Sequence, residues 1–214
     1  MKKLIFILSA FLILVSITSC RQNDQIADEY RNNLNLKSEL EQKETFKNLD
    51  TDSKIRIWKS KLEQIKTKDI SSEQKNLINN ISNEVSKMTN ADYDGIKLFE
   101  YAIEMAKITP EDEFIRMFSV IGDYNRNNNL YNNSTSKLTE GKLVKDLENY
   151  LTNLKTSKIK FLNASKNNSS QRIAAKDCNC RWTCLFYSSV TNDNCNKTNS
   201  GCGFLWTQEC TAVV

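Results

Sequence analysis

The distribution of cysteine constrains this chain more than any other feature of its sequence. Six of its seven cysteines lie in the last 37 residues, and the 157 residues between Cys20 and Cys178 contain none. So short a segment cannot bury enough apolar surface to fold alone, and a cluster of this density is typical of a disulfide framework. We therefore expect a cysteine-rich disulfide module over residues 178–214, built on Cys178, Cys180, Cys184, Cys195, Cys202 and Cys210.

The pairing of these cysteines stays open. Six cysteines allow about 15 pairings, and excluding a bond within the tight Cys178-Asn179-Cys180 turn leaves about 12. A zinc site is the first alternative, but the spacing lacks paired C-x2-C knuckles and the chain has no histidine. A redox pair is the second, and it would need a C-x2-C motif at a helix start, which is missing as well.

The first twenty residues, MKKLIFILSAFLILVSITSC, indicate export. Two lysines precede a mostly apolar run over 4–17, which is short for a membrane span and typical of a signal peptide. The run ends in Ile17-Thr18-Ser19-Cys20, which resembles a bacterial lipobox. We expect residues 1–19 to be a lipoprotein signal peptide and Cys20 to be lipidated. An ordinary signal peptide and a retained membrane helix are the alternatives.

A lipidated Cys20 would make the protein extracytoplasmic, where disulfides persist. Attachment of more than one acyl chain gives stable membrane anchoring. Arg21, rather than an aspartate, follows the cysteine. In lipoproteins of Gram-negative type this favours transfer to the outer membrane, so we expect a lipid anchor in the outer membrane or at the cell surface.

Helical periodicity dominates the middle of the chain. Residues 20–50 are polar and predict a tether and a first helix, with a capping box over Ser38–Glu41. Residues 51–162 predict a helical domain, with a second capping box at Ser71–Gln74 and Pro110 at a first helical position. The apolar stripes of these helices are interpreted as core: Ile55, Trp58, Leu62, Ile65; Leu77, Ile78, Ile81, Val85, Met88; Ile96, Phe99, Ile103, Ala106; Phe114, Met117, Phe118, Ile121; Leu143, Leu147, Leu151, Leu154.

Composition restricts the classes of function. One proline and five glycines are few, which suits helices better than many tight turns. The formal net charge of +4 is spread along the chain, so no nucleic-acid partner is predicted. Histidine, the commonest general base and metal ligand, does not occur, and no phosphate-loop, dinucleotide or nucleophile-elbow motif is present. We predict no enzyme activity, no cofactor and no metal.

The polar stretch 163–177 predicts an exposed linker that proteases can cut. In the tail beyond it, "CLFYSSV" and "GFLWTQECTAV" predict two strands of a small β module. Such a module cannot hide every aromatic side chain, and an exposed apolar patch marks a partner or membrane surface. Trp182, Phe186 and Trp206 are therefore candidate target contacts, with a core role as the alternative for each.

Two stretches together resemble a known family. "CNCRWTC…C…SGCGFLWTQEC" ends a lipoprotein-like precursor whose body contains "IRIWKSKLEQI…SSEQKNLINNI", and this resembles the bacteriocin fulvocin C-related proteins. The matching positions are the Cys178/Cys180 pair, the Gly201-Cys202-Gly203 turn, Trp206 and Cys210. The resemblance implies an antibacterial peptide segment at the C-terminus of a longer chain.

Two functions follow as expectations. The first is a bacteriocin-like precursor, anchored by lipid, whose helical body masks the tail until cleavage in the linker releases a peptide that acts on an unknown envelope target or receptor. The second is an envelope lipoprotein whose disulfide module binds a partner and is never released. The expected fold class is mainly α, with a helical bundle-like body followed by a small disulfide-rich C-terminal β module.

Overall fold

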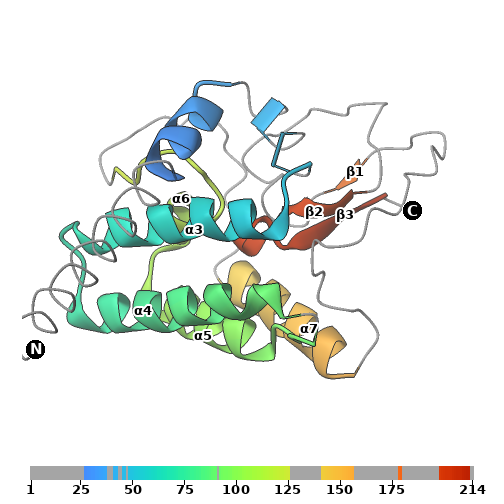
Figure 1. Ribbon diagram of the computed structural model, residues 1–214. Helices are drawn as coiled ribbons and strands as arrows, with labels where there is room; N and C mark the ends of the chain where they lie inside the picture. The colour runs from blue at the N-terminus through green and yellow to red at the C-terminus, as the bar shows by residue number, and fades with distance from the viewer. Residues whose placement is uncertain are drawn as a thin grey trace, which may run out of the picture.

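A computed structural model describes residues 27–37, 41–42, 45–46, 48–90, 92–125, 141–156, 178–179 and 198–212 (Figure 1). The signal peptide, Cys20, the linker and the capping box predicted at Ser38–Glu41 lie wholly or mainly outside these residues. Within them, no helix is long and apolar enough to cross a membrane.

Helix α3 (Thr51–Lys66) forms where the apolar periodicity predicted it. The Asp50 carboxylate accepts a hydrogen bond from the backbone N–H of Ser53 at 2.7 Å, which satisfies a free donor of the first turn. The predicted stripe is buried, and Leu62 and Ile65 are fully covered. Its interpretation as core is confirmed.

Helix α4 (Ser72–Ser86) begins at the predicted capping box. Ser71 Oγ accepts a hydrogen bond from the Gln74 backbone N–H at 3.1 Å, and Gln74 Oε1 accepts one from the Ser71 N–H at 3.0 Å. A short 3₁₀ helix, η1 (Lys87–Thr89), continues the chain and buries Met88. Helix α4 runs back along α3, as Figure 1 shows.

Helices α5 (Ile96–Ile108) and α6 (Glu111–Phe118) follow. Gly95, at φ 72°, lies immediately before α5 in the left-handed conformation that glycine adopts at little cost. Pro110 was predicted at the first helical position of α6 and lies one residue earlier, at the N-cap. The predicted core residues of both helices are buried, except that Ile96 is half-buried.

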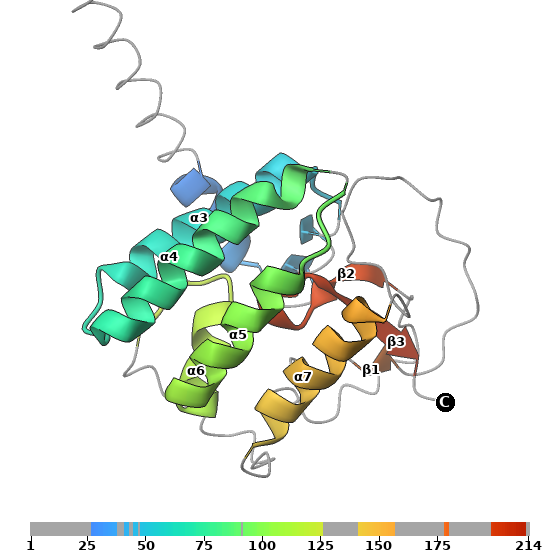
Figure 2. The ribbon, with the colours of Figure 1, turned by 90° about the horizontal axis from the view of Figure 1, so that it is seen from below.

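Helix α7 (Lys142–Lys155) packs across α5 (Figure 2). The rings of Phe99 and Tyr150 lie 4.5 Å apart, and Lys155 Nζ lies 2.9 Å from a carboxylate oxygen of Glu100. The leucine stripe of α7 is buried as predicted. The helices therefore share one apolar core.

The described part of the last 37 residues contains three short strands. They are β1 (Cys178–Asn179), β2 (Thr198–Cys202) and β3 (Gln208–Ala212), and their antiparallel order in the sheet is β1-β3-β2. Between β2 and β3 lies a three-residue 3₁₀ turn, η4 (Phe204–Trp206). "GFLWTQECTAV" was predicted to be one strand, but only its second half is. Leu205 and Trp206 have φ of 50° and 52°, which a strand does not allow.

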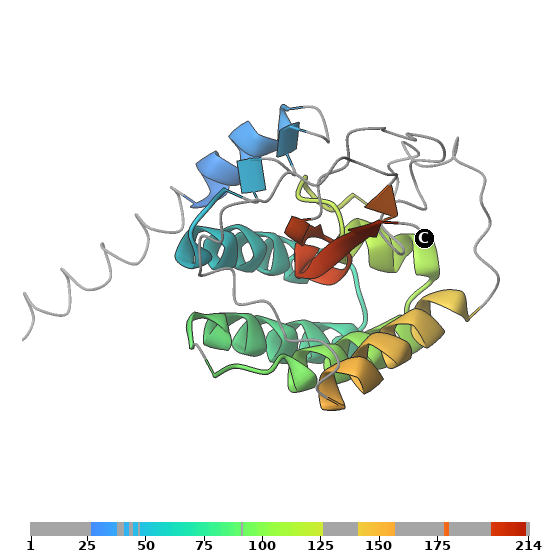
Figure 3. The ribbon, with the colours of Figure 1, turned by 90° about the vertical axis from the view of Figure 1, so that its right-hand side faces the viewer.

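The predicted fold class, a helical body followed by a β module, is wrong. The described chain is mainly helical and no separate β module is seen in it. The physical reason lies in η4, whose three apolar side chains are at most 2 % exposed and belong to the same core cluster as the helices. Figure 3 shows this segment between α3 on one side and α4, α5 and α7 on the other. The short strands extend from a turn that is part of the helical core.

Candidate functional site

Phe204 lies at the centre of the most unusual feature of the fold, the insertion of η4 among the helices. Its ring lies 5.6 Å from that of Phe99 on α5, and 5.9 and 5.3 Å from those of Phe114 and Phe118 on α6. The side chain is fully buried. Burial of a phenylalanine contributes about 1.5–3 kcal/mol, and such aromatic pairs add to it.

Trp206 packs on the other side of the turn, against α3. Its ring lies 5.0 Å from that of Phe46 and 6.0 Å from that of Trp58, both edge to face. Its indole Nε1 donates a hydrogen bond to the backbone carbonyl oxygen of Ser119 at 2.9 Å. The polar end of the indole is therefore satisfied in the interior, as buried tryptophans require.

The backbone of η4 is held in a conformation that its residues disfavour. Gly203, Leu205 and Trp206 have φ of 73°, 50° and 52°. Glycine adopts a positive φ readily, whereas each non-glycine residue there costs on the order of 1–2 kcal/mol. Such strain persists only where the surroundings impose it. The packing around Phe204 and Trp206 supplies that constraint.

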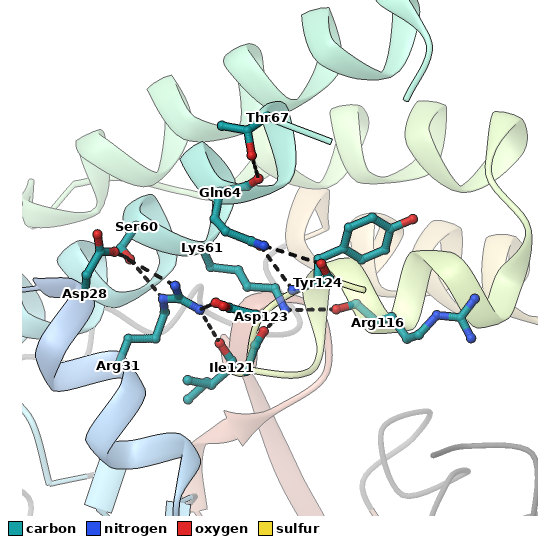
Figure 4. A network of polar contacts seen from close by, with 11 residues as sticks. Asp28, Arg31, Ser60, Lys61, Gln64, Thr67, Arg116, Ile121, Asp123 and Tyr124 are labelled. Atoms are coloured by element: carbon teal, nitrogen blue, oxygen red, sulfur yellow. Dashed lines mark hydrogen bonds and ion pairs between the residues drawn. The ribbon is translucent and has the colours of Figure 1, made fainter. Parts of the chain in front are cut away.

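A buried lysine organises a second site, next to the first (Figure 4). Lys61 on α3 is fully buried, and its ammonium donates hydrogen bonds to the carbonyl oxygens of Gly122 and, at 3.1 Å, of Arg116. Three residues further on, the Gln64 side chain forms two hydrogen bonds with the backbone of the same loop. Its Nε2 donates to the Tyr124 carbonyl at 3.3 Å, and its Oε1 accepts from the Tyr124 N–H at 3.1 Å.

Arg31, from the helical stretch 27–35, joins the network from the opposite side. Its guanidinium is buried. It lies 2.7 Å from the Asp123 carboxylate and donates to the Ile121 carbonyl at 3.2 Å and to Ser60 Oγ at 2.9 Å. The Ser60 hydroxyl in turn donates to Asp28. The loop after α6 is thus fastened to both α3 and the first helical stretch.

The charge on Lys61 is sensitive to its surroundings. Burial, the largest cause, and the nearby Arg31 guanidinium lower the pKa of Lys61 from 10.5 to about 7, against the opposing attraction of the Asp123 carboxylate. Its ammonium donates only to backbone carbonyl oxygens in the contacts described, and it is closed off from solvent. This arrangement suits the holding of a loop.

The two sites meet at Ser119, the residue that follows α6. Its carbonyl oxygen accepts a hydrogen bond from the indole Nε1 of Trp206. Side chains of Lys61, Gln64 and Arg31 form hydrogen bonds with the backbone of the next few residues, Ile121 to Tyr124. The polar network therefore fixes the segment to which the C-terminal turn is bonded. These contacts join the C-terminal turn, the segment after α6 and α3 into one packed unit.

The structure describes few of the predicted site residues. Trp206, a candidate target contact, is 2 % exposed, so in this fold it is a core residue and does not face a partner. Trp182, Phe186 and the predicted lipidation site Cys20 lie outside the described residues. Of the predicted disulfide cysteines, Cys178, Cys202 and Cys210 lie on the three strands of the sheet; Cys180, Cys184 and Cys195 lie outside the described residues.

The network residues were missed in the sequence, although one signal was there. Lys61 lies in the middle of the stripe formed by Trp58, Leu62 and Ile65, so it was bound to face the core. A lysine in that position must find buried acceptors. Arg31 gave no comparable signal, because its polar surroundings in sequence resemble a solvated helix.

Comparison with protein-family models, curated proteins and solved structures finds no match for this chain. Among the residues that the structure describes, no group of three or more metal-ligating side chains is arranged to hold a metal ion.

Proposed function

We propose that this protein is a cell-envelope lipoprotein whose cysteine-rich C-terminal segment stays with its helical body and serves as a binding module. The observation that carries this proposal is the burial of Phe204, Leu205 and Trp206 in the helical core. Removing these side chains would leave a large apolar cavity between α3, α5 and α6. A segment on which the fold of the body depends is poorly suited to routine release.

The lipid anchor rests on the sequence of the first twenty residues. The apolar run and the Ile17-Thr18-Ser19-Cys20 ending support lipidation of Cys20 and an extracytoplasmic location, in the outer membrane or at the cell surface. A binding rather than catalytic function is supported by the described polar network, whose buried groups hold a loop.

A bacteriocin-like precursor is the second candidate. The same burial favours its proposal that the helical body masks the tail. A body that masks the tail would cover its most apolar residues, and Phe204, Leu205 and Trp206 are covered. The cysteine spacing that resembles the fulvocin C-related proteins supports this candidate as well. It requires in addition a cut in the 163–177 linker, and it implies that the free tail acts on an envelope target.

Intact-mass spectrometry on producing cells separates the two candidates. The membrane fraction and the medium are analysed with and without reduction, beside a Cys20→Ser variant. One full-length lipidated chain, gaining about six mass units on reduction of three disulfides, supports the retained module. A lipidated N-terminal fragment with a C-terminal peptide in the medium supports the precursor. A Cys20→Ser chain whose mass differs from that of the wild type only by the exchange of sulfur for oxygen refutes lipidation at that residue.

Antibacterial action needs its own assay, since processing alone does not establish it. The oxidised 177–214 peptide is applied to related bacteria at micromolar concentration, with the reduced and alkylated peptide as control. Growth inhibition by the oxidised form alone supports the precursor. Growth unaffected by both forms contradicts it.

A further inference from the structure

We infer that the helical body contains a peptide-binding site, formed by α3, α5 and α6, that holds the Gly203–Thr207 turn non-covalently and keeps it bound after the connecting chain is cut. This goes beyond both proposed functions, because it concerns how the two parts recognise each other. It rests on the contacts of η4 and does not depend on the lipid.

The first argument is the composition of the site. Phe204 contacts aromatic rings from α5 and α6, and Trp206 contacts Trp58 of α3 together with Phe46. Leu205 between them is 1 % exposed. Phe204 and Trp206 thus contact aromatic side chains that lie 80 or more residues earlier in the chain, and Leu205 belongs to the same core cluster.

The second argument is the specificity of the polar contact. The Trp206 indole donates to the Ser119 carbonyl at 2.9 Å, and that carbonyl belongs to a segment already held by Lys61 and Gln64. The acceptor is therefore positioned by the body itself. A preorganised acceptor of this kind favours binding, because little ordering is left to occur when the ligand arrives.

The third argument is the strained backbone. Leu205 and Trp206 are held at φ of 50° and 52° next to Gly203. Within the turn the Trp206 N–H donates to the Gly203 carbonyl at 3.2 Å, and the N–H and hydroxyl of Thr207 donate to the Phe204 carbonyl at 3.1 and 2.7 Å. The body imposes this conformation by packing, so we expect the separated segment to lose it.

Two consequences follow for the molecule. The site recognises both aromatic side chains of the Gly-Phe-Leu-Trp turn, because this backbone directs Phe204 toward the rings of Phe99 and Phe118 and Trp206 toward those of Phe46 and Trp58. Cutting the chain between body and tail is also insufficient to free the tail. Any release needs a second event that opens the contact between η4 and the helices.

The cysteine distribution allows a clean test. Residues 21–177 contain no cysteine, so a body fragment that starts at Arg21 cannot be disulfide-linked to the tail. We would express residues 21–214 under oxidising conditions, with a specific protease site inserted between Asn168 and Ser169. After folding and cleavage, the sample is diluted to about 1 µM, where only complexes of micromolar or better affinity persist, and is passed over a size-exclusion column.

The expected result is co-elution of the two wild-type fragments. Leu205→Ala is expected to weaken retention at least about tenfold, from the cavity it leaves, while the backbone strain is unchanged because alanine also has a Cβ. Leu36→Ala is the matched control, since Leu36 is 85 % exposed, and it should leave retention unchanged. Separation of the wild-type fragments would overturn the inference. Equal retention of the Leu205→Ala fragments would also overturn it, because other contacts would then hold the tail.

A variant that fails to fold before cleavage is recognised by loss of its helical circular dichroism. Trp206→Phe then replaces it, because this change keeps an aromatic ring in the site and removes the indole donor. Faster dissociation of its fragments than of the wild type supports the site, and unchanged dissociation contradicts it. The test uses purified, unlipidated chain, so its failure is distinct from failure of the proposed envelope function.

Discussion

The indole Nε1 of Trp206 donates a hydrogen bond to the carbonyl oxygen of Ser119 across 2.9 Å of space and 87 residues of sequence. This bond joins the C-terminal turn to the end of α6. The Ser119 hydroxyl oxygen is buried and has no hydrogen-bond partner among the described residues, and the Ser119 N–H donates to the Ile115 carbonyl oxygen at 2.8 Å within the end of α6. The indole bond is therefore the polar contact that joins Ser119 to the C-terminal turn.

Trp206→Phe removes the indole bond together with part of the buried ring. We expect the free energy of unfolding to fall by about 1–3 kcal/mol, because the Ser119 carbonyl would be buried without its donor. Urea denaturation followed by circular dichroism measures this change.

Trp58→Phe is the matched control. Trp58 is also 2 % exposed, but its Nε1 has no hydrogen-bond partner among the described residues, so that substitution loses packing and no such bond. The difference between the two variants isolates the bond. Equal losses would show that the Trp206–Ser119 contact contributes nothing beyond packing.

The buried Lys61 is expected to make the free energy of unfolding depend on pH. Its pKa is lowered to about 7 in the folded chain against 10.5 in the unfolded chain. Between these values the unfolded chain binds a proton that the folded chain does not, so stability rises with pH. The slope from this group is on the order of 1.4 kcal/mol per pH unit. Below about pH 7 both states are protonated, and the full cost of burying the charge is present.

Denaturation at several pH values between about 7.5 and 9.5 checks this prediction, in the window where the slope of one proton applies. The upper limit avoids the titration of Tyr93. Burial and the nearby Glu84 raise the pKa of Tyr93 in the folded chain, so its effect on the free energy of unfolding changes only as the pH passes 10.0, the pKa of an ordinary tyrosine. Burial also lowers the pKa of Lys54, so Lys61→Met should reduce the slope rather than abolish it, whereas Lys68→Met, at an exposed position of the same region, should leave it unchanged. A slope unchanged in Lys61→Met would refute the depressed pKa.

The helical part of this fold was predictable because its signals are local. The Asp50 cap, the Ser71–Gln74 capping box and the apolar stripes each depend on residues within one or two turns. The same logic could have found Lys61, which interrupts a stripe. It could not have found Ser119 or Arg31 as partners, because their contacts join residues 87 and 90 positions apart.

The C-terminal turn was mispredicted for a related reason. The stretch GFLWTQECTAV is rich in aromatic and other residues that favour strands, and this composition predicted a strand. Tertiary packing overrode this preference, since aromatic rings on α3, α5 and α6 hold the turn at positive φ. The assumption that a cysteine-rich tail forms its own module concealed that its apolar residues complete the helical core.

Gln74 couples the start of α4 to the end of α5. Its Oε1 caps the Ser71 N–H, and its Nε2 donates to Thr109 Oγ1 at 3.0 Å in the interior. Gln74→Glu keeps an acceptor for the cap but loses this donor and buries a carboxylate. We expect a loss of about 1–3 kcal/mol in the free energy of unfolding at neutral pH.

Glu73→Gln, in the same turn but exposed, should change stability by less than about 1 kcal/mol. Thermal unfolding of both variants measures the two losses of stability. Similar losses in the two variants would refute the interior contact between Gln74 and Thr109.

Gly122 tests the fit between the first helical stretch and the loop held by Lys61. A Cβ at this position would lie 2.9 Å from Cγ of Asn35 and closer still to its Oδ1, so Gly122→Ala must displace that side chain. Asn35 is exposed and only the end of its side chain is in the way, so we expect a loss of about 0.5–1.5 kcal/mol, the cost of forcing that side chain from its preferred rotamer, and recovery of most of it in the double variant Gly122→Ala/Asn35→Ala. Gly141→Ala provides the contrast. Nothing lies within 4 Å of a Cβ there, but its φ of +83° disfavours any side chain, so its cost of about 1–2 kcal/mol should be unaffected by Asn35→Ala. A double-mutant cycle by urea denaturation measures the coupling. Coupling absent at position 122 would mean that the loop does not pack on Asn35.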